Sequence, residues 1–165
     1  YDVFIYPGFR SEVPFGEENY RARLQARFPG QTKEIERYFA DVHKAAHWMG
    51  NQMAYKAMPG WMSFLTGLLS ANHEQLALRT TKSYLDESFS DPLLRAVLAS
   101  QWGDYGLSPE ESAFGIHALV TSSFYRGAHY PKGGAQTIAK AVEKVLARTG
   151  GEVLVNRVAK EINSF

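Results

Sequence analysis

The chain has 165 residues, 45% of them hydrophobic, which is enough for one domain with a core and too apolar for a disordered chain. Its 18 Lys and Arg residues against 17 Asp and Glu residues give a net charge of +1, which argues against a nucleic-acid-binding arm or a polybasic membrane patch. No cysteine is present, so disulfides, thiolate catalysis and cysteine-ligated zinc are excluded.

The first residues predict two short strands. YDVFIY (1–6) and SEVPF (11–15) flank Pro7-Gly8, a strong turn-forming pair. The apolar and polar residues alternate only weakly, which indicates that both faces of the strands are covered. The strands should pair with each other or with strands outside this chain. Because the chain begins with Tyr1 inside a strand pattern, we interpret it as a piece of a larger protein.

The following residues predict helices. EENYRARLQARF (17–28) ends at a Pro29-Gly30 stop, and Thr32 is expected to cap a long helix that fades near Gly50. The apolar residues of this helix follow a spacing of three, four and seven: Ile35, Tyr38, Phe39, Val42, Ala45, Ala46 and Met49.

The middle of the chain continues the helical pattern. WMSFLTGLLS (61–70) predicts a short apolar helix, and residues 73–89 contain another. Asp91 and Pro92 then have the residue types preferred at the N-cap and first position of a helix.

A second helix start is predicted at Ser108 and Glu111. Their spacing is that of a capping box, and the helix should run through Phe124. The last helix, TIAKAVEKVLA (137–147), stops at Thr149-Gly150-Gly151, and EVLVNRV (152–158) predicts a strand. The expected fold class is α+β, mainly helical, with short strands at both ends.

The glycine pair before the last helix has three interpretations. Gly133 and Gly134 could receive a phosphate at the helix N-terminus, let the loop pass close to a flat group, or form a tight turn that caps the helix. The sequence has no G-x-G-x-x-G after a strand and no Walker motif, and Lys132 precedes the glycines instead of following them. From the residues alone, the turn is favoured.

Three segments together resemble a known family. They are YDVFIY followed by ENYRARLQARFP (18–29), LDESFSDPLLRAVLASQWGDYG (85–106), and FYRGAHYPKGGAQTIAKAVEKVLARTGGEVLVNRVAKEI (124–162). Their order and spacing are similar to the phytoene desaturase-like flavin-dependent oxidoreductases, in the carotenoid isomerase and retinol saturase branch. The family's Rossmann FAD motif is missing from this sequence.

The resemblance implies a domain organisation and a cofactor. Residues 1–130 would form a cap-like substrate-binding domain, and residues 131–165 would return the chain to a flavin-binding domain that is otherwise absent. The complete protein would use FAD to desaturate, saturate or isomerise double bonds of a carotenoid, retinoid or similar apolar substrate. This chain alone is expected to bind no FAD tightly and to be inactive.

The resemblance also suggests site residues, while the catalytic residues stay unknown. The cofactor-binding residues would be Val158, Gly133 and Gly134. The substrate-binding residues would be Tyr130, Pro131, His129, Phe124 and Trp61.

Other side chains have alternative interpretations. His43 and His47 have the spacing of a two-histidine metal site but lack an identifiable third ligand, so an ordinary helix pair is preferred and no metal is expected. His129 would orient its loop or donate a proton near the substrate. The aromatic residues suit core packing, or else a tunnel for a long apolar ligand.

A second function class stays open. The chain could be a standalone, non-catalytic helical module that binds an apolar ligand or a protein partner. The expected partners are an apolar small molecule and the missing flavin-binding domain, not nucleic acid. Residues 61–69 could instead contact a membrane surface, which makes the expected location cytoplasmic or membrane-peripheral.

Overall fold

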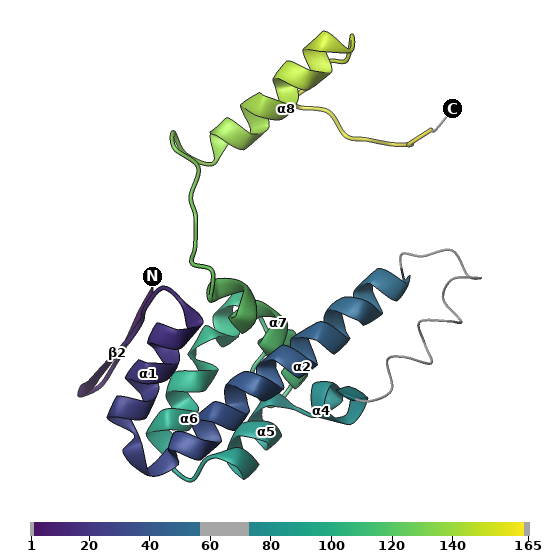
Figure 1. Ribbon diagram of the computed structural model, residues 1–165. Helices are drawn as coiled ribbons and strands as arrows, with labels where there is room; N and C mark the ends of the chain where they lie inside the picture. The colour runs from purple at the N-terminus through teal and green to yellow at the C-terminus, as the bar shows by residue number, and fades with distance from the viewer. Residues whose placement is uncertain (1, 57–72, 164–165) are drawn as a thin grey trace. The chain divides into compact units, whose positions relative to one another are not determined.

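The computed structural model describes residues 2–56 and 73–163. These form two compact units, Tyr1–Ala128 and His129–Phe165 (Figure 1). The substrate-binding role predicted for residues 1–130 and the return role predicted for 131–165 stay predictions. The helix predicted over residues 61–70 lies outside the described residues. The predicted fold class, α+β and mainly helical, is confirmed.

The first unit begins with a β-hairpin. Strands β1 (Asp2–Tyr6) and β2 (Phe9–Val13) are antiparallel and pair across a two-residue loop. Gly8 in this loop has a φ of 72°, a conformation that glycine adopts without a steric penalty. The two predicted strands therefore pair with each other.

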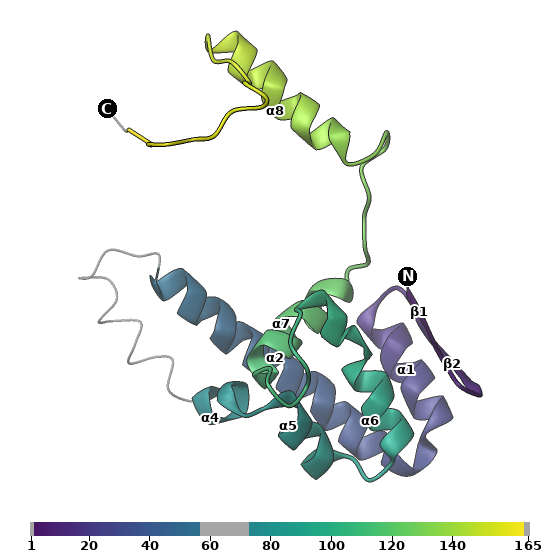
Figure 2. The same ribbon diagram turned by 180° about the vertical axis from the view of Figure 1, so that it is seen from behind.

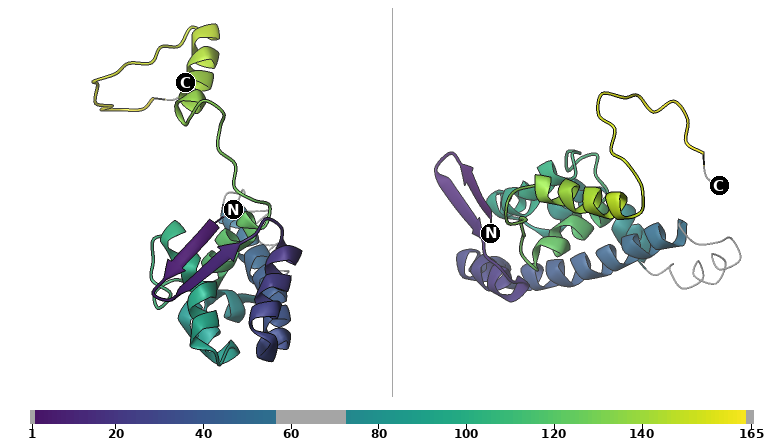
Figure 3. Two further views of the ribbon diagram at one scale, coloured as in Figure 1. Left: turned by 90° about the vertical axis from the view of Figure 1, so that its left-hand side faces the viewer. Right: turned by 90° about the horizontal axis from the view of Figure 1, so that it is seen from above.

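The hairpin has one packed face and one exposed face. Phe4 and Phe9 pack against the core, and Figure 3 (left) shows the hairpin lying across helices α1 (Glu17–Arg27) and α6 (Pro92–Ala99). Side chains alternate between the faces of a strand, so Val3 and Ile5 point the other way and are 42% and 80% exposed. The prediction that both faces are covered is wrong for the described residues.

The long helix begins and ends differently from the prediction. After α1, the 3-10 turn η1 (Pro29–Gln31) leads directly into α2 (Thr32–Lys56). Thr32 is the first residue of α2, and its hydroxyl donates to the Pro29 carbonyl oxygen at 3.1 Å, so it does not act as an N-cap. The helix also continues past Gly50. The low helix propensity of one glycine costs little free energy compared with the packing of a 25-residue helix.

Helix α2 supplies the centre of the first unit. It lies against α7 (Phe114–Phe124), as Figure 1 shows. Its buried side chains follow the predicted spacing closely, with Trp48 in place of the half-buried Ala46: Ile35, Tyr38, Phe39, Val42, Ala45, Trp48 and Met49.

The helix predicted over residues 73–89 is two helices. Helix α4 (Glu74–Leu78) ends before Thr80, and α5 (Thr81–Ser88) begins after it. Thr80 is extended, its hydroxyl accepts the Ser83 N–H at 3.2 Å, and its backbone forms a bridge with Ala113. A threonine that caps the following turn cannot also continue the preceding helix, which explains the break.

Of the two predicted helix starts that follow, one is confirmed. Asp91 caps α6, because one of its carboxylate oxygens accepts the N–H groups of Leu93 and Leu94 at 2.8 and 3.1 Å. The chain then continues into the 3-10 helix η3 (Ser100–Asp104).

The prediction of a capping box at Ser108 and Glu111 is wrong. The Ser108 hydroxyl donates to the Glu111 carboxylate at 2.9 Å, so the two side chains engage each other and not the backbone of a helix. The Ser108 carbonyl oxygen accepts the N–H groups of Glu111 and Ser112, which closes a separate turn. Helix α7 begins only after this turn, with Ala113 at its N-cap.

The second unit contains one helix and no strand among its described residues. Helix α8 (Gln136–Arg148) ends at Thr149 as predicted, and Gly150 has a φ of 79°. An extended segment follows (Figure 2), in which Val155 is 74% exposed. The strand predicted over 152–158 is absent here, because a strand needs a hydrogen-bonded neighbour and the one described sheet contains β1 and β2 alone.

No helix among the described residues is both long and apolar enough to cross a membrane.

The contact between α2, α4 and α7 leads to a paired stability prediction. A Cβ atom at Gly115 would lie 2.7 Å from Met49 Cε and 3.1 Å from both Ala77 Cβ and the Ala77 carbonyl oxygen. Gly115→Ala should therefore lower the free energy of unfolding by about 1–3 kcal/mol. Gly50→Ala, with open space around the new methyl group, should raise it by up to about 1 kcal/mol. Urea denaturation compares the two, and a Gly115→Ala protein as stable as wild type would contradict the close contact.

Candidate functional site

The predicted cofactor glycines lie in a turn that caps α8. Gly133 and Gly134 have φ angles of 95° and 86°, and the Gly134 N–H donates to the Pro131 carbonyl oxygen at 3.0 Å. The Ala135 N–H donates to the Tyr130 hydroxyl at 3.2 Å. The structure thus brings Tyr130, Pro131 and both glycines together in one small motif at the start of the helix.

This motif engages its own backbone donors. The N–H groups of Thr137 and Ile138 donate to the carbonyl oxygens of Gly134 and Ala135 at 3.1 and 3.0 Å. Phosphate binding at a helix N-terminus requires free N–H groups, so these residues do not fit a phosphate site. A Cβ atom at Gly134 would meet nothing within 4 Å, so the turn conformation alone accounts for this glycine.

The other predicted site residues lie on separate elements of the two units. Val158 lies in the extended segment after α8 and is 86% exposed. His129 is also exposed, at the start of the second unit. Phe124 is half-buried at the end of α7, in the first unit. Trp61 lies outside the described residues.

A neutral groove lies between β1 and α6. Trp102 of η3 forms part of it and is 49% exposed. No charged side chain contributes to its lining, which consists of Phe4, Ile5, Tyr6, Ala96, Ala99, Ser100, Trp102 and Pro109. A neutral, largely apolar lining suits an uncharged apolar ligand, because no ionic group has to be desolvated when the ligand enters.

Two hydroxyl groups line this groove. The Tyr6 hydroxyl is hydrogen-bonded to the Ser100 hydroxyl and lies 3.2 Å from the Ala96 carbonyl oxygen. The Ser100 hydroxyl donates to the same carbonyl oxygen at 2.8 Å. Both hydroxyl oxygens have a further lone pair, so they can accept one hydrogen bond from a ligand hydroxyl. No local sequence signal links Tyr6 to Ser100, which lie 94 residues apart, so the pair was not predicted.

A second group of polar side chains is buried in the core. His117 is fully buried, with Nε2 2.9 Å from the Tyr38 hydroxyl and Nδ1 3.2 Å from the Tyr105 hydroxyl. Burial lowers the pKa of His117 to about 4, so the imidazole is neutral at pH 7. Burial also raises the pKa of Tyr38 well above its usual value. A neutral imidazole between two hydroxyls satisfies its donor and its acceptor, which makes this group a structural element of the core.

The histidine pair on α2 has other partners. His43 Nε2 lies 2.6 Å from a Glu17 carboxylate oxygen, and His47 Nδ1 lies 3.3 Å from the Asn51 side-chain amide. Among the described residues there is no group of three His, Cys, Asp or Glu side chains that could hold a metal ion. The preferred interpretation of an ordinary helix pair agrees with these contacts.

Comparison with known proteins gives a consistent match. The chain is 32% identical to an all-trans-retinol 13,14-reductase of Danio rerio over 92% of this chain and 26% of that protein. It is 27% identical to the Homo sapiens all-trans-retinol 13,14-reductase over 98% of this chain and 28% of that protein. The chain is a relative of the retinol saturases. The resemblance to that branch is therefore confirmed.

The match covers part of each relative. The chain spans about a quarter of the length of the curated retinol saturases that it matches. A Danio rerio protein named inactive all-trans-retinol 13,14-reductase is 30% identical over 86% of this chain and 24% of its own length. No family model matches the chain, and no solved structure matches it.

The buried His117 predicts a pH-dependent stability. Its pKa is about 4 in the folded chain against 6.5 for an unperturbed histidine, so the unfolded chain binds the proton more readily. His117 makes its full contribution to the free energy of unfolding above about pH 6.5. This contribution decreases by up to about 3 kcal/mol as the pH drops towards 4. Urea denaturation between pH 7 and pH 4 measures this loss.

The matched variant is His117→Gln, which keeps a donor and an acceptor but does not titrate. Carboxylates contribute to acid unfolding equally in both proteins, so the variant should lose distinctly less stability over this pH range. Equal losses in the two proteins would show that His117 is not buried in neutral form.

The turn before α8 gives a further prediction. Gly134→Ala places a Cβ atom on a residue with a φ of 86°, which costs about 1–2 kcal/mol. The first turn of α8 should then exchange its amide hydrogens faster, as measured by NMR. Gly30→Ala is the control, because Gly30 has no positive φ and no atom within 4 Å of the new methyl group. Unchanged exchange in Gly134→Ala would contradict the capping role of the turn.

Proposed function

We propose that the complete protein is a flavin-dependent oxidoreductase that saturates a carbon–carbon double bond of a retinoid, and that this chain supplies part of its substrate-binding surface. The observation that supports this most directly is the similarity to all-trans-retinol 13,14-reductases over 92–98% of the chain. Several such relatives match the same region at similar identity, so the likeness does not depend on one short motif.

The neutral groove between β1 and α6 is the surface that best suits such a substrate. A retinol is a long apolar molecule with one hydroxyl at its end. The groove offers apolar walls from Phe4, Ile5 and Trp102, and hydroxyl oxygens from Tyr6 and Ser100. Burying apolar surface would provide most of the binding free energy, and the hydroxyl pair would set the orientation of the ligand.

Among the described residues, fewer could contact FAD than could contact the substrate. A reduced flavin, when bound, supplies the electron pair needed to saturate a double bond. The turn at Gly133 and Gly134 does not fit the pyrophosphate of FAD, since its backbone donors are already engaged. The exposed segment around Val158 has apolar side chains and open backbone groups that could pack against another domain. In this proposal the residues of this chain bind and orient the substrate and exclude water from it.

Retinol binding to the chain tests the role of the groove. All-trans-retinol should quench tryptophan fluorescence saturably, with much of the signal lost in Trp102→Phe. Ala96 is exposed on the groove side of α6, so Ala96→Leu should narrow the groove without disturbing the core. We expect about tenfold weaker binding, equivalent to about 1.4 kcal/mol.

The control is Ala40→Leu, which adds the same side chain to the exposed face of α2. Equal affinities in the two variants would exclude the groove as the binding surface. The oxidoreductase activity is tested separately, by supplying the complete protein with a reductant and all-trans-retinol and measuring the product mass. No gain of two hydrogen atoms under any reducing condition would contradict the proposed reaction, whatever the result for the groove.

A further inference from the structure

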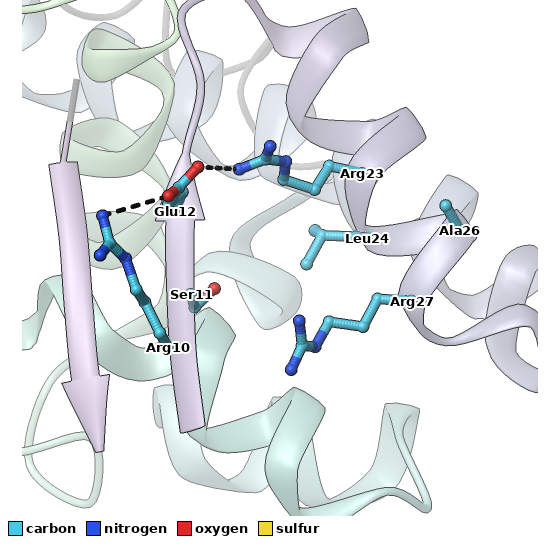
Figure 4. Close-up of a pocket in the computed structure, with 7 residues that line it drawn as sticks. All are labelled: Arg10, Ser11, Glu12, Arg23, Leu24, Ala26 and Arg27. Carbon is cyan, nitrogen blue, oxygen red and sulfur yellow. Dashed lines mark hydrogen bonds and ion pairs between the residues drawn. The ribbon is translucent and has the colours of Figure 1, made fainter. Parts of the chain in front are cut away.

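A second groove, between β2 and α1, differs from the first in charge. Figure 4 shows the side chains of Arg23 and Arg27 extending from α1 towards β2, while the guanidinium of Arg10 lies on the other side of Glu12. Glu12 is the one carboxylate among its lining residues, which are Arg10, Ser11, Glu12, Arg23, Leu24, Ala26 and Arg27. Three cations and one anion leave an excess of two positive charges in a single hollow, while the net charge of the whole chain is +1.

The single carboxylate is shared between two arginines. Glu12 Oε2 lies 2.6 Å from Arg23 Nη1, and Glu12 Oε1 lies 3.2 Å from Arg10 Nη2. The hydrogen bond and charge of Arg23, followed by the charge of Arg10, lower the pKa of Glu12, so this carboxylate stays ionised at neutral pH. Each guanidinium has five N–H donors, so one carboxylate cannot satisfy both groups. Arg10 and Arg23 are 64% and 50% exposed, and their remaining donors can reach a ligand.

The third arginine has no carboxylate partner. Arg27 forms no ion pair with any described residue, and its guanidinium lies over the Phe9 ring at 4.1 Å from the ring centre. Stacking on an aromatic face reduces the freedom of the guanidinium without using its in-plane donors. Arg27 is therefore held in place with its donors available at the edge of the groove.

The other described hollows lack this excess. Arg126 lines one of them together with Glu17, and Arg27, which borders two hollows, lines another together with Asp91. The groove at β1 and α6 is neutral. The two positive charges in excess therefore single out the groove of Figure 4.

We propose that the groove between β2 and α1 binds a phosphate group. A phosphate monoester carries between one and two negative charges at pH 7, which matches the excess, and its oxygens accept paired N–H donors from guanidinium groups. A simple carboxylate would neutralise half of the excess charge. Both a free phosphate ester and a lipid with a phosphate headgroup present such a phosphate. Ile5, which is paired with Arg10 across the hairpin, is 80% exposed. This site is independent of the proposed retinoid reaction.

The first arm of the test uses soluble anions. Titration of the whole chain with inorganic pyrophosphate, followed by amide NMR, should give saturable shifts confined to β2 and α1. Arg27→Gln and Arg23→Gln should each weaken binding at least about tenfold. Arg27→Lys keeps the charge but loses the paired donors, so it should also bind more weakly than wild type. Arg95→Gln is the control, since Arg95 pairs with Asp86 outside the groove and its loss should change nothing.

The second arm uses vesicles. Phosphatidylcholine vesicles with and without phosphatidic acid are sedimented with the same variants. Binding that requires phosphatidic acid and Arg27 identifies a lipid headgroup as the source, and binding of pyrophosphate alone identifies a soluble phosphate ester. Thermal unfolding of each variant confirms that it is folded. The proposal is overturned if neither arm shows binding, or if Arg95→Gln weakens binding as much as Arg27→Gln.

Discussion

The first unit depends on a buried polar contact between two helices that are far apart in the sequence. Tyr38 on α2 and His117 on α7 are both fully buried, and their hydrogen bond of 2.9 Å joins residues 79 positions apart. Removing either partner would leave a polar atom in an apolar core, which costs more than the bond contributes. Because Tyr105 occupies the other imidazole nitrogen, the same histidine also fixes the segment before α7. This arrangement therefore joins α2, α7 and the segment before α7.

The two grooves use different strands of one short hairpin. Tyr6 of β1 donates to the Ala96 carbonyl oxygen of α6 beside the neutral groove, while Arg10 and Glu12 of β2 line the groove beside α1. A single hairpin therefore contributes an apolar lining to one groove through one strand and charged side chains to the other groove through the other strand. The hairpin gains its stability from packing against the helices, because two strands alone are only marginally stable in water.

The sequence predicted the positions of the helices better than the residues at which they begin and end, or the segments that they contact. The spacing of apolar residues located α2, and Asp91 with Pro92 located α6, because these signals are local. Thr32 and Ser108 were wrongly predicted as helix caps, since such a side chain can serve a helix, a turn or another side chain, and tertiary contacts decide which. The grooves could not be predicted, because each combines side chains from separate elements. The strand predicted over 152–158 had the right residue types but has no neighbouring strand among the described residues.

In the proposed function, the residues of this chain bind and orient the substrate. The buried group of Tyr38, His117 and Tyr105 is closed by its own hydrogen bonds, and His117 is too deeply buried to exchange protons with a substrate. The same region is also present in a relative named as inactive, at 30% identity. The presence of this segment therefore does not by itself distinguish the proteins named as reductases from the one named as inactive. In the proposed function, substrate binding by this chain is separable from catalysis, so it can be measured on the chain alone.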